Sequence, residues 1–236
     1  MCVAVAALVV GVGVVLAGGD EGGDRDQAAY APHIDPARFS NTVDNPFLPL
    51  LPGSRWVYEG RVDEGFVRKV VEVTSETRQV MGVTCVVVRD VVHLDGRLHE
   101  DTVDWYAQDA GGNVWNFGEE TKKFDNGAAS AKGSWEAGVD GAQPGVVMKA
   151  YPKVGDRYRQ EYKRGEAEDM AGVVSVTERA VVPFRPFDHM LMTKDFSPLD
   201  PGALEHKYYA GGVGLVLEVI VKGGQGRVEL VEMTRS

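Results

Sequence analysis

The sequence predicts an all-β domain, an antiparallel meander that forms an open barrel or half-barrel. Short stretches rich in Val and aromatic residues alternate apolar with polar positions, as half-buried strands do. Turns containing Gly, Asp or Pro separate these stretches. No stretch after the N-terminal leader keeps the 3.6-residue apolar period of a helix. Many short strands joined by tight turns favour a barrel, and a two-sheet sandwich is the alternative.

The first half of the domain contains most of the clear hairpin signals. Pro46, Pro49 and Pro52 forbid a helix and favour an extended chain that ends in a turn. In the first strand, 55–59, alternation places Trp56 and Tyr58 on one face. Further strands are predicted at 66–74, 83–93, 98–108 and 113–118, joined by turns at 63–65, 95–96 and 109–112.

The second half repeats this pattern after an interruption. Residues 125–145 are rich in Gly and Ala and are predicted to form a long excursion, a kind of segment that is often functional or disordered. Strands then follow at 156–163, 171–182, 187–194, 204–210, 214–222 and 227–233.

The N-terminus predicts export to the cell envelope or the extracellular space. Residues 1–19 resemble a signal peptide, with an uncharged apolar run shorter than the about 20 residues of a membrane span. No basic residue precedes the run, so we expect the true start to lie upstream of Met1. Residues 20–44 are predicted to be a flexible tether, and residues 45–236 a single β-rich domain.

The leader also resembles a bacterial lipobox at Leu16-Ala17-Gly18-Gly19. Gly19 stands where a lipoprotein has its lipid-modified Cys, and a thioether requires a sulfur atom. The chain as written would therefore attach to a membrane only through an uncleaved leader.

The composition is that of a globular protein with a sizeable core. Of 236 residues, 44% are hydrophobic and 25% charged, and the net charge is −10. This acidity argues against nucleic acid as a partner, because nucleic-acid binding requires a basic face. Without the leader, Cys85 has no partner for an intramolecular disulfide. Its apolar surroundings, VTCVVV, predict a small buried residue.

Four aromatic residues on one predicted hairpin are the candidate ligand-lining residues: Trp105, Tyr106, Trp115 and Phe117. A four-residue loop at 109–112 would place Tyr106 opposite Trp115 and Asp104 opposite Phe117. A slip of one residue would place Trp105 opposite Trp115. Aromatic residues grouped in this way most often fill a core, and the functional alternative is that some line an apolar cavity.

The sequence contains no motif that identifies a catalytic, cofactor or metal site. His93 and His99 flank the turn at 95–96, but a two-residue turn pairs His93 with Leu98 and directs the histidines to opposite faces. The Gly-x-Ser-x-Gly and His-Glu-x-x-His motifs are missing. Among 35 acidic residues no pair stands out as acid and base. These observations favour a protein that is not an enzyme and needs no cofactor.

Four stretches resemble a family of uncharacterised exported proteins and predicted lipoproteins of bacteria. They are NPFLPLLPGSRWVYEG (45–60), EDTVDWYAQDAGGNVWNFGE (100–119), GSWEAGVDGAQPG (133–145) and EHKYYAGGVGLVLE (205–218). The resemblance implies a location in the cell envelope and carries over no activity or site residues.

Three functions remain open from the sequence. The first is a non-catalytic envelope protein that binds a hydrophobic small molecule or envelope component, by analogy with exported half-barrels that carry lipids. The second is a secreted hydrolase that acts on an envelope polymer through unidentified carboxylates. The third is a protein-interaction module that uses residues 125–145 as its contact loop.

Overall fold

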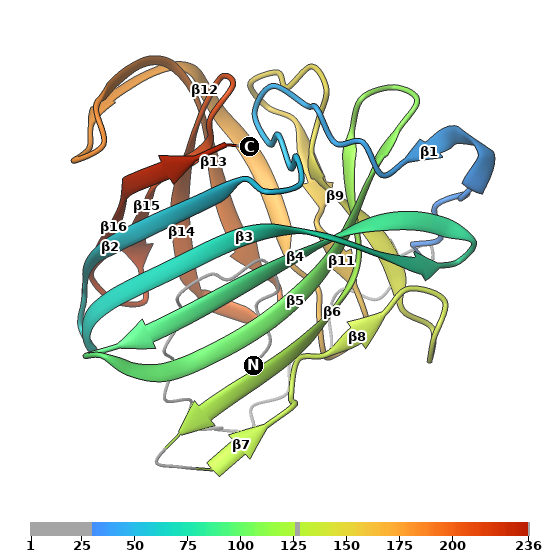
Figure 1. Cartoon of the computed structure of the whole chain (residues 1–236), viewed down its shortest axis with the longest axis horizontal. Coiled ribbons are helices and arrows are strands. Elements are labelled where there is room, and N and C mark those ends of the chain that lie inside the picture. Colours follow the sequence, from blue (N-terminus) through green and yellow to red (C-terminus); the bar gives the residue numbers. More distant parts are fainter. Residues whose placement is uncertain (1–29, 126–127, 236) are drawn as a thin grey trace, which may run out of the picture.

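The computed structural model describes residues 30–125 and 128–235, and it confirms the predicted all-β fold. Antiparallel strands form one sheet that curls into a nearly closed barrel (Figure 1). A 3-10 turn, η1 (Pro36–Arg38), precedes the strands. The strands are β1 (Phe39–Ser40), β2 (Arg55–Val62), β3 (Gly65–Val80), β4 (Val83–Leu94), β5 (Arg97–Asp109), β6 (Val114–Asp125), β7 (Ala128–Ser130), β8 (Trp135–Glu136), β9 (Gln143–Met148), β10 (Arg157–Arg159), β11 (Glu161–Tyr162), β12 (Met170–Val181), β13 (Pro186–Ser197), β14 (Asp200–Ala210), β15 (Gly214–Lys222) and β16 (Gly226–Thr234).

Two meanders form most of the barrel wall. Strands β2 to β6 pair in sequence order, and so do β12 to β16. Pairing of β16 with β2 joins the two meanders, so the last strand lies beside the first long one. All these pairings are antiparallel, as tight turns between successive strands require.

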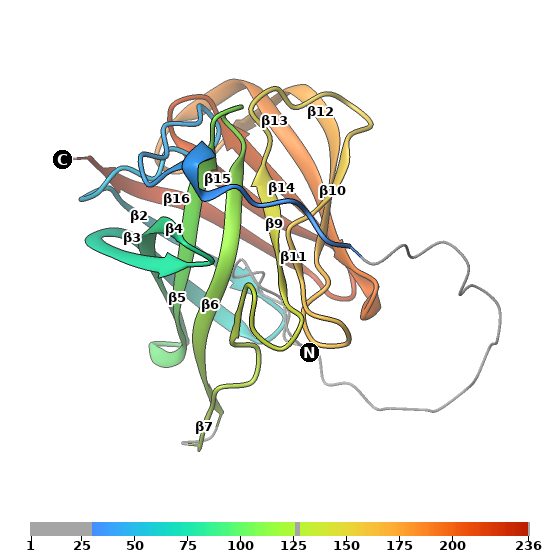
Figure 2. The ribbon, with the colours of Figure 1, turned by 90° about the vertical axis from the view of Figure 1, so that its right-hand side faces the viewer.

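A single stretch of chain, 157–162, brings the two edges of this sheet together. Its first half, β10, pairs with β12, and its second half, β11, pairs with β9. Figure 2 shows β9, β11 and β10 between β6 and β12. Among the described residues, β9 and β12 do not pair directly, and this leaves one seam in the barrel. Gln160 lies at the crossing point between the two halves.

The predicted strands are present, and most are longer than predicted, but the prediction missed β7, β8 and β9 in and after the excursion, and the strand predicted at 156–163 is divided into β10 and β11. Strand β15 spans the predicted residues 214–222, whereas β6 continues past Gly118 to Asp125. Gly118 tolerates its φ of +138° because it lacks a Cβ, which would lie 2.4 Å from the Trp135 carbonyl oxygen. The sequence suggested a strand end at Gly118, but this glycine permits close approach of β8 within a longer strand.

The apolar residues form two clusters on opposite faces of the sheet. The larger cluster fills the interior of the barrel and includes Trp56, Tyr58, Leu191 and Leu230. The smaller cluster lies on the outer face of β4, β5 and β6 and includes Cys85, Trp105 and Phe117. Residues of the excursion at 125–145 cover this outer cluster, and Trp135 is buried within it. Burial raises the pKa of the Cys85 thiol to about 12, which agrees with the expected buried, unreactive cysteine.

Residues 30–44 were predicted to be a flexible tether, and this prediction is wrong for that stretch. Strand β1 pairs with β5, the Tyr30 hydroxyl donates to the Pro144 carbonyl, and Val43 is fully buried in the interior cluster. Composition predicted a tether because this stretch has no periodicity, but its few large residues pack against the finished barrel. The leader at 1–19 and residues 20–29 lie outside the described residues.

Residues 43–53, which we call the cap, cross one end of the barrel and lead into β2 (light blue in Figure 1). The buried side chain of Asn45 anchors the cap. Its amide donates to the carbonyls of Gly112, at 2.9 Å, and Lys149, at 3.2 Å, and its oxygen accepts from the Phe47 amide. Farther along, the Pro46 carbonyl accepts from the Gly212 amide. One asparagine thus ties the cap to two separate turns at this end of the barrel.

We expect Asn45→Ala to lower the free energy of unfolding by about 1–3 kcal/mol, because it leaves buried backbone groups without partners. Thr42→Ala, at an exposed position nearby, is the control and should change stability by less than about 0.5 kcal/mol. Urea denaturation of the three proteins measures both effects. Equal stability of wild type and Asn45→Ala would show that the cap is not anchored in this way.

Candidate functional site

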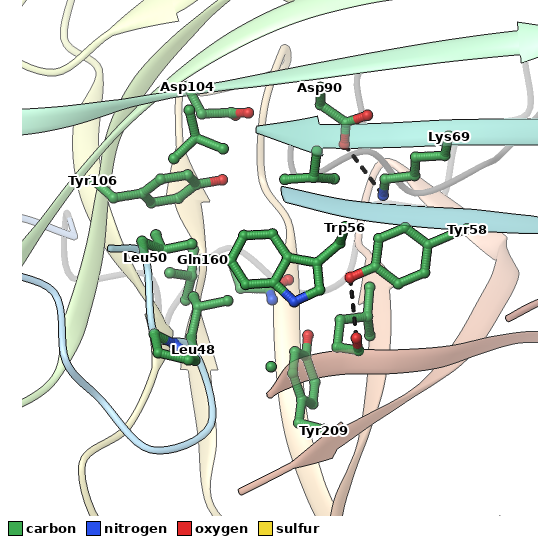
Figure 3. Close-up of a pocket in the computed structure, with 16 residues that line it drawn as sticks. Leu48, Leu50, Trp56, Tyr58, Lys69, Asp90, Asp104, Tyr106, Gln160 and Tyr209 are labelled. Carbon is green, nitrogen blue, oxygen red and sulfur yellow. Dashed lines mark hydrogen bonds and ion pairs between the residues drawn. The ribbon is translucent and has the colours of Figure 1, made fainter. Parts of the chain in front are cut away.

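A cavity lies inside the barrel directly beneath the cap (Figure 3). Its volume is about 80 Å³. The empty space between its walls, mouth included, is about 730 Å³. Leu48 and Leu50 of the cap form one wall, and Val71, Val88 and Leu215 of the strands form others. The cavity suits a small molecule with an apolar body.

Four aromatic side chains surround the apolar part of the cavity: Trp56, Tyr58, Tyr106 and Tyr209. Trp56 and Tyr58 share a face of β2 because side chains alternate along a strand. Their polar atoms are satisfied by the neighbouring chain: the Trp56 indole donates to the Val213 carbonyl at 2.8 Å and the Tyr58 hydroxyl to the Leu215 carbonyl at 3.0 Å. These bonds fix both rings at the cavity wall.

Charged residues replace apolar ones two positions deeper along the same strands. Val71 gives way to Lys69 on β3, Val88 to Asp90 on β4, and Tyr106 to Asp104 on β5. Two residues of a strand advance about 6–7 Å, so these charges form a layer about that far below the apolar residues. The cavity is therefore apolar near the cap and charged at its floor.

Lys69 and Asp90 form a buried ion pair at this floor. The Lys69 Nζ lies 3.2 Å from Asp90 Oδ2 and 3.8 Å from Glu218 Oε1. Burial lowers the pKa of Lys69, but the two carboxylates more than offset this, so the pKa is raised and Lys69 stays charged. Burial raises the pKa of Asp90 to about 6 despite Lys69. Asp90 Oδ1 has no hydrogen-bond partner.

Asp104 lies beside this pair and, within the described residues, forms no ion pair of its own. Burial, followed by the nearby Asp90, raises its pKa well above the usual value, while Lys69 and a hydrogen bond with Tyr106 oppose this rise. Asp104 Oδ1 has no hydrogen-bond partner, although the residue is only 4% exposed. A buried carboxyl in this setting is neutral unless a cation or a donor reaches it.

The charged layer continues across the barrel beyond the cavity. Glu218 faces Lys207 in the pairing of β15 with β14, and the Lys207 Nζ lies 3.1 Å from Asp195 Oδ2. Asp195 also accepts from Thr193, at 2.6 Å, and from Gln160, at 3.2 Å. Five strands thus contribute alternating charges in the order Asp90, Lys69, Glu218, Lys207, Asp195. Gln160, which lines the cavity, connects this row to the seam.

Acidic groups outnumber basic ones in the interior. The buried residues of the described chain include nine Asp or Glu and only two Lys. Burial raises the pKa of Asp169 to about 7 and that of Glu205 to about 7. Neither Glu205 oxygen has a hydrogen-bond partner. The interior therefore carries protonated carboxyls near neutral pH and has more capacity for cations than its lysines use.

Of the four aromatic residues nominated from the sequence, the structure places only Tyr106 at the cavity. Trp105 and Phe117 lie in the outer cluster, and Trp115 packs against it from a partly buried position. The Trp115 indole donates to Asp109 Oδ2 at 2.9 Å. The pleat explains this division, because Trp105 and Tyr106 are successive residues of β5 and point to opposite faces.

Both registers predicted for this hairpin are wrong. Trp115 pairs with Ala107, and Tyr106 pairs with Asn116. The turn between β5 and β6 spans residues 110–113, and the Asp109 carboxylate caps it by accepting from the backbone amides of Gly111 and Asn113 and from the Asn113 side chain. A register shift between Asp104 and Tyr106 then places Asp104 opposite Glu119. The predicted register assumed an uncapped turn and did not include hydrogen bonds from the Asp109 side chain.

The hairpin that carries the two histidines has the predicted turn. Leu94 pairs with Arg97 across Asp95-Gly96, and His93 pairs with Leu98. Within residues 30–125 and 128–235, no group of three or more His, Cys, Asp or Glu side chains could hold a metal ion. The described chain also contains no helix that is long and apolar enough to span a membrane.

Sequence reasoning missed the charged floor, although a signal for it exists. Lys69 and Asp90 each interrupt a run of valines at every second position: Val67, Val71 and Val73 on β3, and Val86, Val88 and Val92 on β4. A charge on an otherwise apolar face of a strand implies a buried charge that needs a partner. The partners lie on other strands, so the sequence could not identify them.

Comparisons with known proteins find similarity in structure alone. No family model and no curated protein matches the sequence. Two solved structures resemble the barrel: a "putative exported protein with YmcC-like fold" of Bacteroides fragilis, at 14% identity and a TM-score of 0.48, and a "putative lipoprotein" of Parabacteroides distasonis, at 15% and 0.44. Each comparison covers 80% of this chain and 99% and 98% of the respective other chain. These are proteins of the class that the four sequence stretches resemble, and neither has an established activity.

The raised pKa of Glu205 predicts how stability depends on pH. Between its ordinary value of 4.5 and the folded value of about 7, the folded protein keeps a proton that the unfolded chain has released. This contribution is complete below pH 4.5 and is lost as the pH rises toward 7, at roughly 1.4 kcal/mol per pH unit.

Glu205→Gln removes this titrating group and should make the decline in the free energy of unfolding less steep, while Asp90 and Asp169, whose pKa values are also raised, keep their own contributions. Glu76→Gln, at an exposed position, should leave the slope as in wild type. Urea unfolding at intervals from pH 4.5 to 7.5 measures the three slopes. An unchanged slope in Glu205→Gln would mean that Glu205 is already ionised in the folded protein.

Proposed function

We propose that this protein is a non-catalytic binding protein that holds a small amphipathic molecule inside the barrel, beneath the cap. The observation that carries the proposal is the layered cavity, with Leu48, Leu50 and Val88 near the cap and Lys69 and Asp90 at the floor. Such an arrangement buries an apolar body and orients one polar group. The volume of the cavity, about 80 Å³, favours a compact ligand.

We also propose that the protein works outside the cytoplasm. The signal-peptide-like sequence of residues 1–19 supports this location. Mass spectrometry of the N-terminus of the protein recovered from its native cells tests the proposal. We expect a processed chain that begins just after Ala17 in the envelope or extracellular fraction. An intact leader on protein found only in the cytosol would contradict it.

A carboxylate-dependent hydrolase is the second candidate, favoured by the presence of Asp90 and Asp104 in one cavity. Two features argue against it. The Lys69 ammonium engages Asp90 in an ion pair, and the cap covers the cavity that a polymer would have to enter. The interaction module has less support, because Trp135 in its supposed contact loop is only 4% exposed.

Filling the cavity tests the binding function. Hexan-1-ol fits the cavity and should perturb the Trp56 indole N–H signal in the NMR spectrum of wild type. Val88→Phe places a ring in the cavity and should abolish this saturable perturbation. Val176→Phe adds the same bulk at a partly exposed position of β12 and should bind as wild type does.

The outcomes separate the candidate functions. Binding to Val88→Phe with wild-type affinity would contradict a site in the barrel interior. Hexan-1-ol has no bond that a hydrolase can cleave, so the hydrolase needs its own assay: release of soluble fragments from isolated envelope polymer by wild type would favour it.

A further inference from the structure

Aromatic rings in the wall of the cavity lie next to the carboxylates of its floor. We call the group formed by Trp56, Tyr58, Tyr106, Tyr209, Asp90 and Asp104 the chamber. Figure 3 shows the rings around the same space and the two carboxyl groups on the neighbouring strands. The faces of aromatic rings carry negative charge density, so rings and carboxylates attract the same kind of ligand, a cation.

The carboxylates of the chamber offer oxygen atoms that no other group uses. Asp90 Oδ1 and Asp104 Oδ1 are buried and have no hydrogen-bond partner, although both residues line the cavity. Buried carboxylate oxygens without partners are costly in a folded protein. A ligand that donates hydrogen bonds or carries positive charge would remove this cost.

The local charge balance has room for one more cation. Asp90 and Glu218 share the Lys69 ammonium, at 3.2 and 3.8 Å, and the Lys207 ammonium lies between Glu218 and Asp195 in the same row. With Asp104 included, four carboxyl groups therefore face two ammonium groups. Burial, followed by the nearby Asp90, raises the pKa of Asp104, so that Asp104 is protonated when no further cation is present.

Lys69 shows that the chamber stabilises an ammonium group. Its Nζ lies over the Tyr58 ring, 5.8 Å from the centroid, while it pairs with Asp90. This is the combination of ring face and carboxylate that recognises organic cations. On the other side of the cavity, a second tyrosine, Tyr106, lies beside Asp104 and forms a hydrogen bond with it, and within the described residues Asp104 forms no ion pair.

We infer that the ligand of the barrel is a small organic cation, an amine or quaternary ammonium compound with a compact apolar body, whose charged nitrogen lies between Asp104 and the aromatic rings of the chamber. This inference rests on the proposed binding function and specifies its ligand class. An anionic ligand would face these carboxyl groups, and a purely apolar ligand would leave the two free oxygens without partners.

Choline and 3,3-dimethylbutan-1-ol test the inference, because they have the same shape and differ only in the charged nitrogen. Isothermal titration calorimetry at pH 8 should show that wild type binds choline at least about tenfold more tightly than the neutral alcohol. Asp104→Asn keeps the shape of the side chain and removes its charge, and the ratio should fall to about threefold or less. Asp188→Asn, at an exposed position on β13, is the control and should keep the wild-type ratio.

If a variant fails to fold, the comparison of choline with the neutral alcohol on wild type still tests the inference. Equal or tighter binding of the neutral alcohol would overturn the cationic ligand class and leave the binding function standing. Binding of neither choline, the alcohol nor hexan-1-ol would overturn the binding function itself. A preference for choline that Asp104→Asn retains in full would contradict the assigned position of the charged nitrogen.

Discussion

Closure of the sheet by residues 157–162 is the constraint on which the other features depend. One short stretch pairs through β10 with β12 and through β11 with β9, and so turns a twisted antiparallel sheet into a container. Only after closure does one face of every long strand become an interior surface. Side-chain alternation then divides residues between the two faces: Tyr106 enters the cavity, and Trp105, its neighbour in the chain, joins the outer cluster.

In a closed interior, each polar residue on the inner face costs folding free energy unless a hydrogen-bond or ion-pair partner reaches it. Lys69 and Lys207 cannot reach bulk water, so each needs carboxylates from adjacent strands, and the alternating row from Asp90 to Asp195 provides them. The row does not balance the acids, and burial together with this surplus raises the carboxyl pKa values. Replacing buried ion pairs with apolar residues is often neutral or stabilising. The charges beneath the apolar, aromatic layer therefore support the proposed binding function.

The cap closes one end of the barrel, and other segments outside the long strands cover part of its outer face. Asn45 ties the cap to two turns with a single buried amide, so that Leu48 and Leu50 can form the roof of the cavity. On the outer face, Trp135 and part of residues 30–44 cover Trp105 and Phe117. Segments that composition alone would call linkers therefore complete the core. A polar segment without periodicity can still pack if a few of its large side chains fit into hollows on the rest of the protein. A local sequence pattern does not show whether such hollows exist.

Local patterning by itself determined the strands, most of the turns and the all-β class, because alternation and turn chemistry act over a few residues. It also placed Trp56 and Tyr58 on one face and paired His93 with Leu98. It failed where the outcome depended on contacts between distant residues. The Asp109-capped loop changed the register of the aromatic hairpin, and the pairing of Asp104 with Tyr106 within a charged cavity became visible only with the strands in place. Which face is interior, which charges meet and which loop becomes the cap are all decided by closure of the barrel, since closure joins strands that are far apart in the chain.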